Sequence, residues 1–322
     1  MHTDTKADAS EEPDDFKSGF VSLVGRPNTG KSTLLNAFIG RKIAITTSRP
    51  QTTRNRLTGI HNRPGAQVVF MDTPGIHKPH DKLGKFMVKT AVQSLEEVDC
   101  AIFVVEPFRP RPDRPDSTQP GPGDRYIAEV LKAAGLPVIL AINKVDTIKH
   151  AEAILPVMEA YRELMDFMEM VPISAKTGQN VPLLMDMVIG LLPEGPKFYP
   201  DDILTDQIER FMAAEIVRER VMTHTRDEIP HSVAVEIEEF SEREGGSVGV
   251  FIRAVVYVER ESQKRIIIGK SGSLLKKIGT EARVDIARLL DTSVYLDLWV
   301  KVKGDWRRDD RSLAAFGYRR EV

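Results

Sequence analysis

The segment from Gly25 to Ser32 carries the first residues whose types and spacing point to chemistry. It reads Gly-Arg-Pro-Asn-Thr-Gly-Lys-Ser, which fits the pattern G-x-x-x-x-G-K-[ST]. The glycines of such a loop let backbone N–H groups close around phosphate oxygens, and the N-terminus of the next helix adds partial positive charge. We expect Lys31 to reach the β- and γ-phosphates and the Ser32 hydroxyl to ligate Mg²⁺. The loop alone indicates neither the nucleotide nor its purpose.

The sequence on either side of this loop has the order that the motif requires. An apolar run over residues 20–24 precedes it, and a helical pattern over residues 33–39 follows it. This context favours a phosphate site over an ordinary glycine turn before a helix. The residues predicted to surround the phosphates are Gly25, Arg26, Pro27, Asn28, Thr29, Gly30, Lys31, Ser32 and Thr33.

Three more polar segments follow apolar runs, and two of them indicate the base. Asp72, Thr73, Pro74 and Gly75 come after residues 68–71; there a carboxylate can hold Mg²⁺ through water, and the Gly75 N–H can sense a γ-phosphate. The other two segments are Asn143-Lys144-Val145-Asp146, after residues 138–142, and Ser174-Ala175-Lys176, after residues 171–173.

Guanine is the base that the second and third segments select. The Asp146 carboxylate can accept hydrogen bonds from guanine N1–H and N2–H₂, a donor pair that adenine lacks. We expect Asn143 to tie the base loop to the phosphate loop and the Lys144 stem to lie against the purine. The Ala175 N–H is expected to donate to guanine O6. Together the segments predict GTP rather than ATP.

The composition limits what else the chain does. Its 322 residues suffice for two domains, and 41% apolar with 29% charged residues is typical of a soluble globular protein. A net charge of −2 excludes a generally basic protein that coats polyanions, so any nucleic-acid contact is local. Cys100 lies in an apolar run and is interpreted as a buried thiol of a reducing compartment. The sequence contains no run of about eighteen apolar residues, the length that a membrane-spanning helix needs. Without the apolar region of a signal peptide, residues 1–18 are predicted to be a disordered acidic tail of a cytoplasmic protein.

The elements that must position these residues form two domains. Residues 19–192 alternate short apolar runs with helical patterns, which predicts a doubly wound α/β domain with a mostly parallel sheet. A proline-rich segment near residues 106–124 is predicted to be a surface insertion, neither helix nor central strand; a ligand for a partner domain is the alternative. Residues 193–202 are interpreted as a linker, and 203–322 as a small α+β domain with a C-terminal tail.

The second domain carries a Gly-x-x-Gly turn, Gly269 to Gly272, between two predicted helices. Such a turn lets a nucleic-acid backbone approach closely, and Lys270 would supply positive charge. A plain helix–helix turn is the alternative, and a solvated helix face is the alternative for the basic residues nearby. The predicted RNA-binding residues are Ile268, Gly269, Lys270, Ser271, Gly272, Lys276 and Lys277.

Taken together, these segments resemble the Era family of bacterial GTPases, and the resemblance covers nearly everything after the acidic tail. Pro50-Gln51-Thr52-Thr53-Arg54 is similar to its switch I, in which Thr53 would close on Mg²⁺. The Gly-x-x-Gly region is similar to a type II KH domain. The resemblance implies a P-loop GTPase that uses Lys31, Thr53 and Gly75 in catalysis and holds Mg²⁺ through Ser32, Thr53 and, by way of water, Asp72.

The resemblance also predicts how fast the site works and which ions it uses. Ras-like enzymes place a water-orienting glutamine where this chain has Ile76, so slow intrinsic turnover is expected. Relatives with an asparagine at the position of Asn28 use K⁺ near the phosphates, so K⁺ is a second expected ion. His77 and His80, without a third ligand, are interpreted as solvated residues.

The partners follow from the same resemblance. The KH domain would bind the 3′ region of small-subunit (16S) ribosomal RNA, and the protein would act as a monomer in assembly of the 30S subunit. A nucleotide-gated RNA-binding protein with incidental hydrolysis is one alternative. A regulator at the inner face of the cell membrane is another, although no basic amphipathic anchor is evident.

Overall fold

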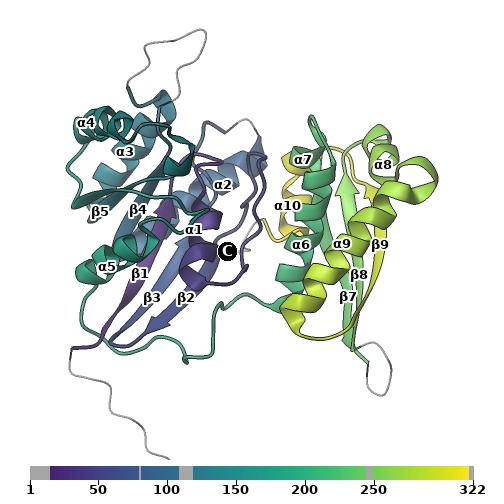
Figure 1. Ribbon diagram of the computed structural model, residues 1–322. Helices are drawn as coiled ribbons and strands as arrows, with labels where there is room; N and C mark the ends of the chain where they lie inside the picture. The colour runs from purple at the N-terminus through teal and green to yellow at the C-terminus, as the bar shows by residue number, and fades with distance from the viewer. Residues whose placement is uncertain (1–14, 80, 109–118, 244–248, 319–322) are drawn as a thin grey trace, which may run out of the picture.

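The computed structural model describes residues 15–79, 81–108, 119–243 and 249–318, which form two lobes side by side (Figure 1). The N-terminal lobe runs to the end of α5 (Val181–Leu191). An extended segment then crosses to the C-terminal lobe, and helix α10 (Asp310–Ala315) returns to the boundary between the lobes.

The N-terminal lobe is built on one six-stranded sheet with the order β2-β3-β1-β4-β5-β6. Its strands are β1 (Lys17–Val24), β2 (Leu57–Arg63), β3 (Ala66–Asp72), β4 (Cys100–Val105), β5 (Val138–Ile142) and β6 (Glu169–Pro172). All neighbouring pairs are parallel except β2 and β3. The predicted doubly wound, mostly parallel fold is therefore confirmed.

Helices cover both faces of this sheet, which explains why the central strands β4 and β5 are apolar and buried at every position. Along β4, Ile102 packs into the core under α1 (Lys31–Ile39) and α5, whereas Phe103 packs under the helices of the opposite face. Those helices are α2 (Lys82–Gln93), α3 (Pro122–Ala134) and α4 (Leu155–Arg162). Short 3₁₀ turns, Ser94–Glu97, Val145–Thr147 and Ala151–Ile154, complete this lobe.

Two sequence-based boundaries need correction, and one strand was not predicted. Strand β1 begins at Lys17 and Phe16 is buried, so the predicted tail does not extend to residue 18; residues 1–14 lie outside the described part. Helix α3 begins at Pro122, inside the segment predicted to contain no helix, because proline is tolerated in a first helical turn where its missing N–H has no partner. Strand β2 carries no continuous apolar run and was not predicted from the sequence.

The C-terminal lobe packs helices against one face of a three-stranded sheet with the order β7-β8-β9. Its elements are α6 (Glu209–His224), α7 (Ile229–Ser232), β7 (Ala234–Glu242), β8 (Val250–Val258), α8 (Glu261–Ile268), α9 (Ser273–Leu290) and β9 (Val294–Val302), with 3₁₀ turns at Lys270–Gly272 and Trp306–Arg308. β7 is antiparallel to β8, and β9 is parallel to β8. Ile203 and Ile208 precede α6 rather than belonging to it.

The two lobes share a buried contact around Arg54, which is only 1% exposed. Its guanidinium donates to the carbonyl oxygens of Val233 at 2.6 Å and His231 at 3.1 Å, and it lies over the Trp306 ring. Beside it, Leu83 of α2 packs in one cluster with Trp306 and other apolar residues of the C-terminal lobe. Residues far apart in the sequence thereby hold the lobes together.

Candidate functional site

The phosphate loop joins β1 to α1 and packs too tightly for side chains at its glycines. A Cβ on Gly25 would lie 2.4 Å from the Val104 carbonyl oxygen. Gly30 has φ 97°, and a Cβ there would lie 2.2 Å from Asn143 Nδ2. Both positions therefore require glycine. The loop lines a cavity of about 310 Å³ together with Thr33, Gly75, Lys144 and the residues around Thr53.

Lys31 is buried at the start of α1. Its ammonium donates to the carbonyl oxygens of Gly25 at 3.1 Å and Arg26 at 3.0 Å. Burial lowers the pKa of Lys31 to about 8, and the nearby charge of Asp72 acts in the opposite direction. A phosphate beside this amine would therefore favour its charged form strongly.

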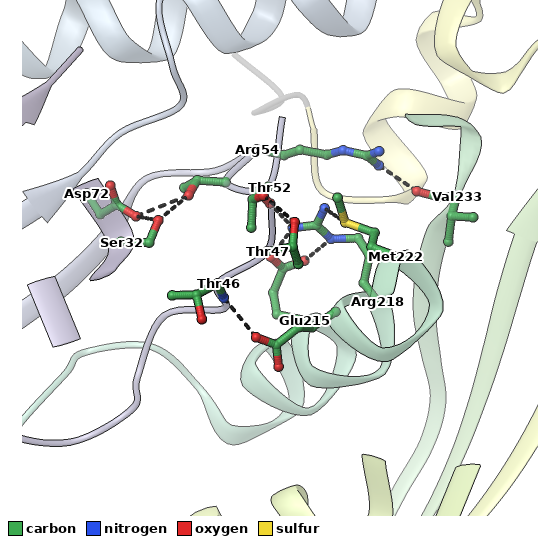
Figure 2. A network of polar contacts seen from close by, with 12 residues as sticks. Ser32, Thr46, Thr47, Thr52, Arg54, Asp72, Glu215, Arg218, Met222 and Val233 are labelled. Atoms are coloured by element: carbon green, nitrogen blue, oxygen red, sulfur yellow. Dashed lines mark hydrogen bonds and ion pairs between the residues drawn. The ribbon is translucent and has the colours of Figure 1, made fainter. Parts of the chain in front are cut away.

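Three oxygen-bearing side chains converge beside Lys31, as Figure 2 shows for Ser32 and Asp72. The Ser32 hydroxyl donates to Asp72 Oδ2 at 2.6 Å, and the Thr53 hydroxyl donates to the same atom at 3.1 Å. The two hydroxyl oxygens are 2.9 Å apart. Asp72 Oδ1 is buried and has no hydrogen-bond partner among the described residues. Burial raises the pKa of Asp72, an effect that the Lys31 charge opposes. Hard oxygen donors around an unpaired carboxylate oxygen fit Mg²⁺.

Asn143 links three loops of the site. Its amide donates to the Thr29 carbonyl oxygen at 2.8 Å, which is the expected tie between base loop and phosphate loop. Its Oδ1 accepts the N–H groups of Lys144 at 2.8 Å and Ala175 at 2.9 Å. The Ala175 N–H, predicted to donate to guanine O6, is thus already bonded within the protein. The sequence motifs do not indicate this contact between Asn143 and the loop that carries Ala175.

Asp146, the carboxylate predicted to read the base, is exposed and is held in place from one side. Asp146 Oδ1 accepts the Ser174 hydroxyl at 2.7 Å, so its orientation is fixed while the residue remains open to solvent. The Lys144 ammonium lies across the phosphate loop, where it donates to the Asn28 carbonyl oxygen at 2.6 Å and pairs with Glu106. Lys176 next to this edge is exposed.

Residues 73–77, called switch II here, follow β3 and pack against the phosphate loop. A Cβ on Gly75 would lie 2.5 Å from Pro27 N, so only glycine fits there. Thr73 donates to the Leu23 carbonyl oxygen at 2.8 Å, and Pro74 is buried. Ile76 is 1% exposed and packs into the core, so it takes no part in the cavity.

Two sequence-based assignments gain detail from the structure. The Arg26 side chain turns away from the cavity and pairs with Asp124 of α3 at 2.8 Å, so this residue contributes only backbone to the phosphate loop. His77 bonds to the Gly75 carbonyl oxygen and to Gln51, joining the two switches rather than standing free. His80 lies outside the described residues. Among the described residues no cluster of three or more His, Cys, Asp or Glu side chains that could hold a metal ion is present.

A second site lies on the C-terminal lobe, between α9 and β9. The turn that precedes α9 places Gly269, Ser271 and Gly272 at φ 73°, 51° and 78°, a backbone that exposes Lys270. A groove of about 370 Å³ runs from this turn. Of the predicted residues, Gly272 and Lys276 line it, Lys277 is exposed nearby, and Ile268 is half-buried.

Sequence reasoning missed the far wall and floor of this groove. Thr280 and Arg283 continue the line of Lys276 along α9 at spacings of four and three, a helical signal that could have found them. Leu296 and Leu298 of β9 form the other wall, although their alternation indicated only core positions. Gly279 lines the groove between them without a side chain.

This fold and these two sites define a class of protein: a P-loop GTPase domain joined to a KH domain. Family models agree, since one described as "50S ribosome-binding GTPase" matches residues 20–144 and one described as "KH domain" matches residues 228–307.

Known proteins narrow the class. GTPase Era of Geobacter metallireducens is 52% identical over 303 residues, covering 94% of this chain and 98% of the relative, and GTPase Era of Heliobacterium modesticaldum is 48% identical with 94% and 97% covered. A crystal structure of Era with MgGDPNP and nucleotides 1506–1542 of 16S ribosomal RNA matches with a TM-score of 0.88 at 42% identity, covering 94% of this chain and 99% of that one. An Aquifex aeolicus Era variant bound to GDP and AlF₄⁻ matches equally well. The chain belongs to the Era family of GTPases.

The buried amine of Lys31 makes nucleotide binding dependent on pH. A bound phosphate raises the pKa of Lys31 above its value of about 8 in this structure. Below that pH the amine is charged with or without nucleotide; above it, binding must take up a proton. We expect the affinity for GDP to fall by up to about tenfold per pH unit between about pH 8 and about pH 9. Calorimetry in two buffers of different ionisation enthalpy measures the proton uptake; a flat affinity with none taken up contradicts this assignment.

Asp146→Asn should weaken guanine preference and admit xanthine nucleotides, because an amide can donate to the oxygen that xanthine carries at C2. Two hydrogen bonds to a charged group are lost, so GDP affinity should fall by about a hundredfold or more. Fluorescence competition with GDP and XDP measures the selectivity. Asp166→Asn, at an exposed carboxylate away from the cavity, is the matched control. Unchanged selectivity would mean that Asp146 does not read the base.

Proposed function

We propose that the protein is a GTP-hydrolysing switch that binds the 3′ region of 16S ribosomal RNA through its KH domain and assists assembly of the 30S subunit. One observation carries this proposal. The segment over residues 46–54, which ends with the switch I motif Pro50–Arg54 and is called switch I from here on, lines the nucleotide cavity through Thr46 and Thr53. It also contacts α6 and the α6–β7 connection of the KH domain. A nucleotide that reshapes switch I therefore acts directly on the RNA-binding domain.

The chain's own residues prepare the phosphates for attack by water. Lys31 and the loop N–H groups bind and orient the phosphates, and the Gly75 N–H stands where a γ-phosphate would contact switch II. Ser32 and Thr53 would hold Mg²⁺ directly and Asp72 through water; when bound, this ion neutralises charge on the β- and γ-phosphates. Because Ile76 is buried and apolar, no side chain at that position orients the water, and intrinsic turnover is proposed to be slow.

K⁺ is proposed as a second ion at the edge of the phosphate loop. Asn28 has φ 68° and donates its amide to the Ser48 carbonyl oxygen at 3.0 Å, so it joins the phosphate loop to switch I. Backbone carbonyl oxygens of a switch I loop beside an asparagine are ligands that suit a large monovalent cation. Such a cation would supply positive charge at the phosphates, where no arginine is among the described residues that line the cavity.

The groove between α9 and β9 is proposed to hold single-stranded RNA. Its turn lets a phosphate backbone approach, Lys270, Lys276 and Arg283 supply positive charge, and Leu296 and Leu298 offer an apolar wall to unstacked bases. The Era complex with 16S ribosomal RNA supports RNA of this origin as the ligand.

The remaining expectations stay proposals. We propose a GTPase domain over residues 19–192, extended by the two strand residues before it, a linker over 193–202 and a KH domain over 203–322. We also propose a cytoplasmic monomer, with association at the inner face of the cell membrane as a secondary location. Among the described residues no helix is long and apolar enough to cross a membrane.

Lys270→Asp combined with Ser271→Asp should abolish tight RNA binding, because two new negative charges would repel the phosphate backbone at the turn. GTP affinity should stay unchanged. The matched control is Lys132→Asp with Ala133→Asp, an adjacent exposed pair on α3. Filter binding with the 3′ segment of 16S ribosomal RNA measures the effect. Equal RNA affinity for the two double variants would remove the turn from the binding site.

K⁺ should stimulate GTP hydrolysis several times more than Na⁺ at equal ionic strength, because Na⁺ is too small for a site built of loop carbonyls. Phosphate release under multiple turnover measures the rates, with and without ribosomal RNA. Asn28→Ala should remove the difference between the ions while nucleotide binding persists. Equal rates in the two salts would show that Asn28 is only a loop residue.

A further inference from the structure

Helix α6 of the KH domain binds switch I at two points, through consecutive residues. The Thr46 N–H donates to Glu219 Oε1 at 2.8 Å, and the Thr52 carbonyl oxygen accepts from the Arg218 guanidinium. Figure 2 shows Arg218 beside Thr52, and it shows Thr46 on the same segment. The KH domain thus holds the segment before and after its bend.

Arg218 is fully buried, and its nitrogens are satisfied in a way that fixes their direction. Nε and Nη2 bind the carboxylate of Glu215 at 2.8 and 2.5 Å, and Nη1 contacts Met222 Sδ at 3.3 Å. The remaining donor capacity of Nη2 goes to Thr52. A guanidinium held on three sides by its own helix reaches the switch with little loss of side-chain entropy.

Glu219 is held equally well, at 2% exposure. Its Oε2 pairs with Lys42 at 2.6 Å, which leaves Oε1 for the Thr46 N–H. Lys42 lies in the loop after α1, so both sides of this carboxylate serve the GTPase domain. The carboxylate is therefore oriented before the switch segment meets it.

Holding Thr52 also places Thr53. The Thr52 carbonyl and the Thr53 nitrogen belong to one planar peptide, so a bond that fixes the first orients the second. In this orientation the Thr53 hydroxyl lies 2.9 Å from Ser32 Oγ and 3.1 Å from Asp72 Oδ2. The arrangement of the oxygen cluster is thus coupled to a guanidinium of the other domain.

We propose that Arg218 and Glu219 are positioning residues for GTP hydrolysis, supplied by the KH domain, which hold switch I so that Thr53 completes the magnesium site. The inference rests on the proposed role of Ser32, Thr53 and Asp72. Neither residue lines the nucleotide cavity, so each acts through the switch backbone.

The same helix connects this contact to the RNA groove. Arg220 of α6 pairs with Asp285 of α9, and His224 Nε2 lies 2.7 Å from Glu281 of α9. The Gly-x-x-Gly turn immediately precedes α9. RNA that shifts α9 would therefore move α6 and, with it, the two residues that hold switch I.

The test compares Arg218→Met with Arg210→Met, a control on the same helix, in the full-length protein. Losing a charged hydrogen bond to the Thr52 carbonyl should lower kcat about tenfold or more and raise the Mg²⁺ concentration needed for half-maximal turnover. GDP affinity should stay within about twofold, because the phosphate loop does not depend on Arg218. Arg210→Met removes a guanidinium from the same helix that bonds to the carbonyl oxygens of Ile237 and Glu238 rather than to switch I, and it should leave kcat and the Mg²⁺ requirement unchanged. Equal losses in both variants would show that α6 acts only through packing.

A double-mutant cycle with Thr53→Ala separates positioning from general stability. If Arg218 acts through Thr53, Arg218→Met should cost little further turnover once Thr53 lacks its hydroxyl. The same fold-loss in both backgrounds overturns the inference. A Thr53→Ala variant with unchanged turnover and Mg²⁺ requirement instead overturns the magnesium assignment, and the inference with it.

Glu219 provides the second variant pair, which decides the matter if Arg218→Met does not fold. Glu219→Gln keeps an oxygen for the Thr46 N–H and should retain most of the turnover. Glu219→Met lacks that acceptor and should lose severalfold in kcat at unchanged GDP affinity. Thermal unfolding and binding of 16S ribosomal RNA at the groove verify that both variants fold. Equal turnover for the two variants contradicts the role of Glu219.

Discussion

The position of the KH domain depends on the hydrogen bonds between one buried cation, Arg54, and backbone carbonyl oxygens of that domain. Arg54 is the last residue of switch I and lies buried between the two domains. Its guanidinium donates to the carbonyl oxygens of Pro230, His231 and Val233. Burial lowers the pKa of Arg54, and no carboxylate of the described residues pairs with it. A charge in such surroundings is stable only while those carbonyls enclose it, because an unpaired buried cation costs several kcal/mol. The last residue of switch I and the KH domain therefore cannot move independently.

Because of this constraint, the nucleotide cavity and the KH domain share one segment, switch I. At the nucleotide cavity, Thr53 belongs to an oxygen cluster that suits Mg²⁺; one residue later, Arg54 belongs to the KH domain. Under the proposed mechanism, a nucleotide would act on switch I through its phosphates, whereas RNA would act on it through α9 and α6. Coupling between distant sites requires an element that both of them bias. Here that element is a segment of nine residues, 46–54, and the helix beside it.

The residues of the GTP site could be predicted from the sequence because each motif directly follows a strand, and the carboxyl ends of parallel strands lie at the same edge of the sheet. The order of apolar runs was enough to predict the doubly wound sheet, and the spacing of Gly269 and Gly272 was enough to predict the turn of the KH domain. Strand β2 was missed because Gly59 and polar residues interrupt its apolar pattern. The bond between Asn143 and Ala175, and the turn of Arg26 toward Asp124, depend on residues brought together only by folding. The whole contact between α6 and switch I belongs to this second kind, since local spacing contains no trace of it.

The binding site of Arg54 is completed by residues at the other end of the chain. Its guanidinium lies over the rings of Trp306 and Tyr318, and 264 residues separate Arg54 from the Tyr318 hydroxyl that it contacts at 3.4 Å. During synthesis the N-terminal domain emerges first and folds first. Until Trp306 and Tyr318 have been synthesised, the guanidinium of Arg54 lacks the two rings that cover it in the folded protein. A nascent chain that stops before Trp306 therefore has a GTPase domain whose contact with the KH domain is still incomplete at Arg54.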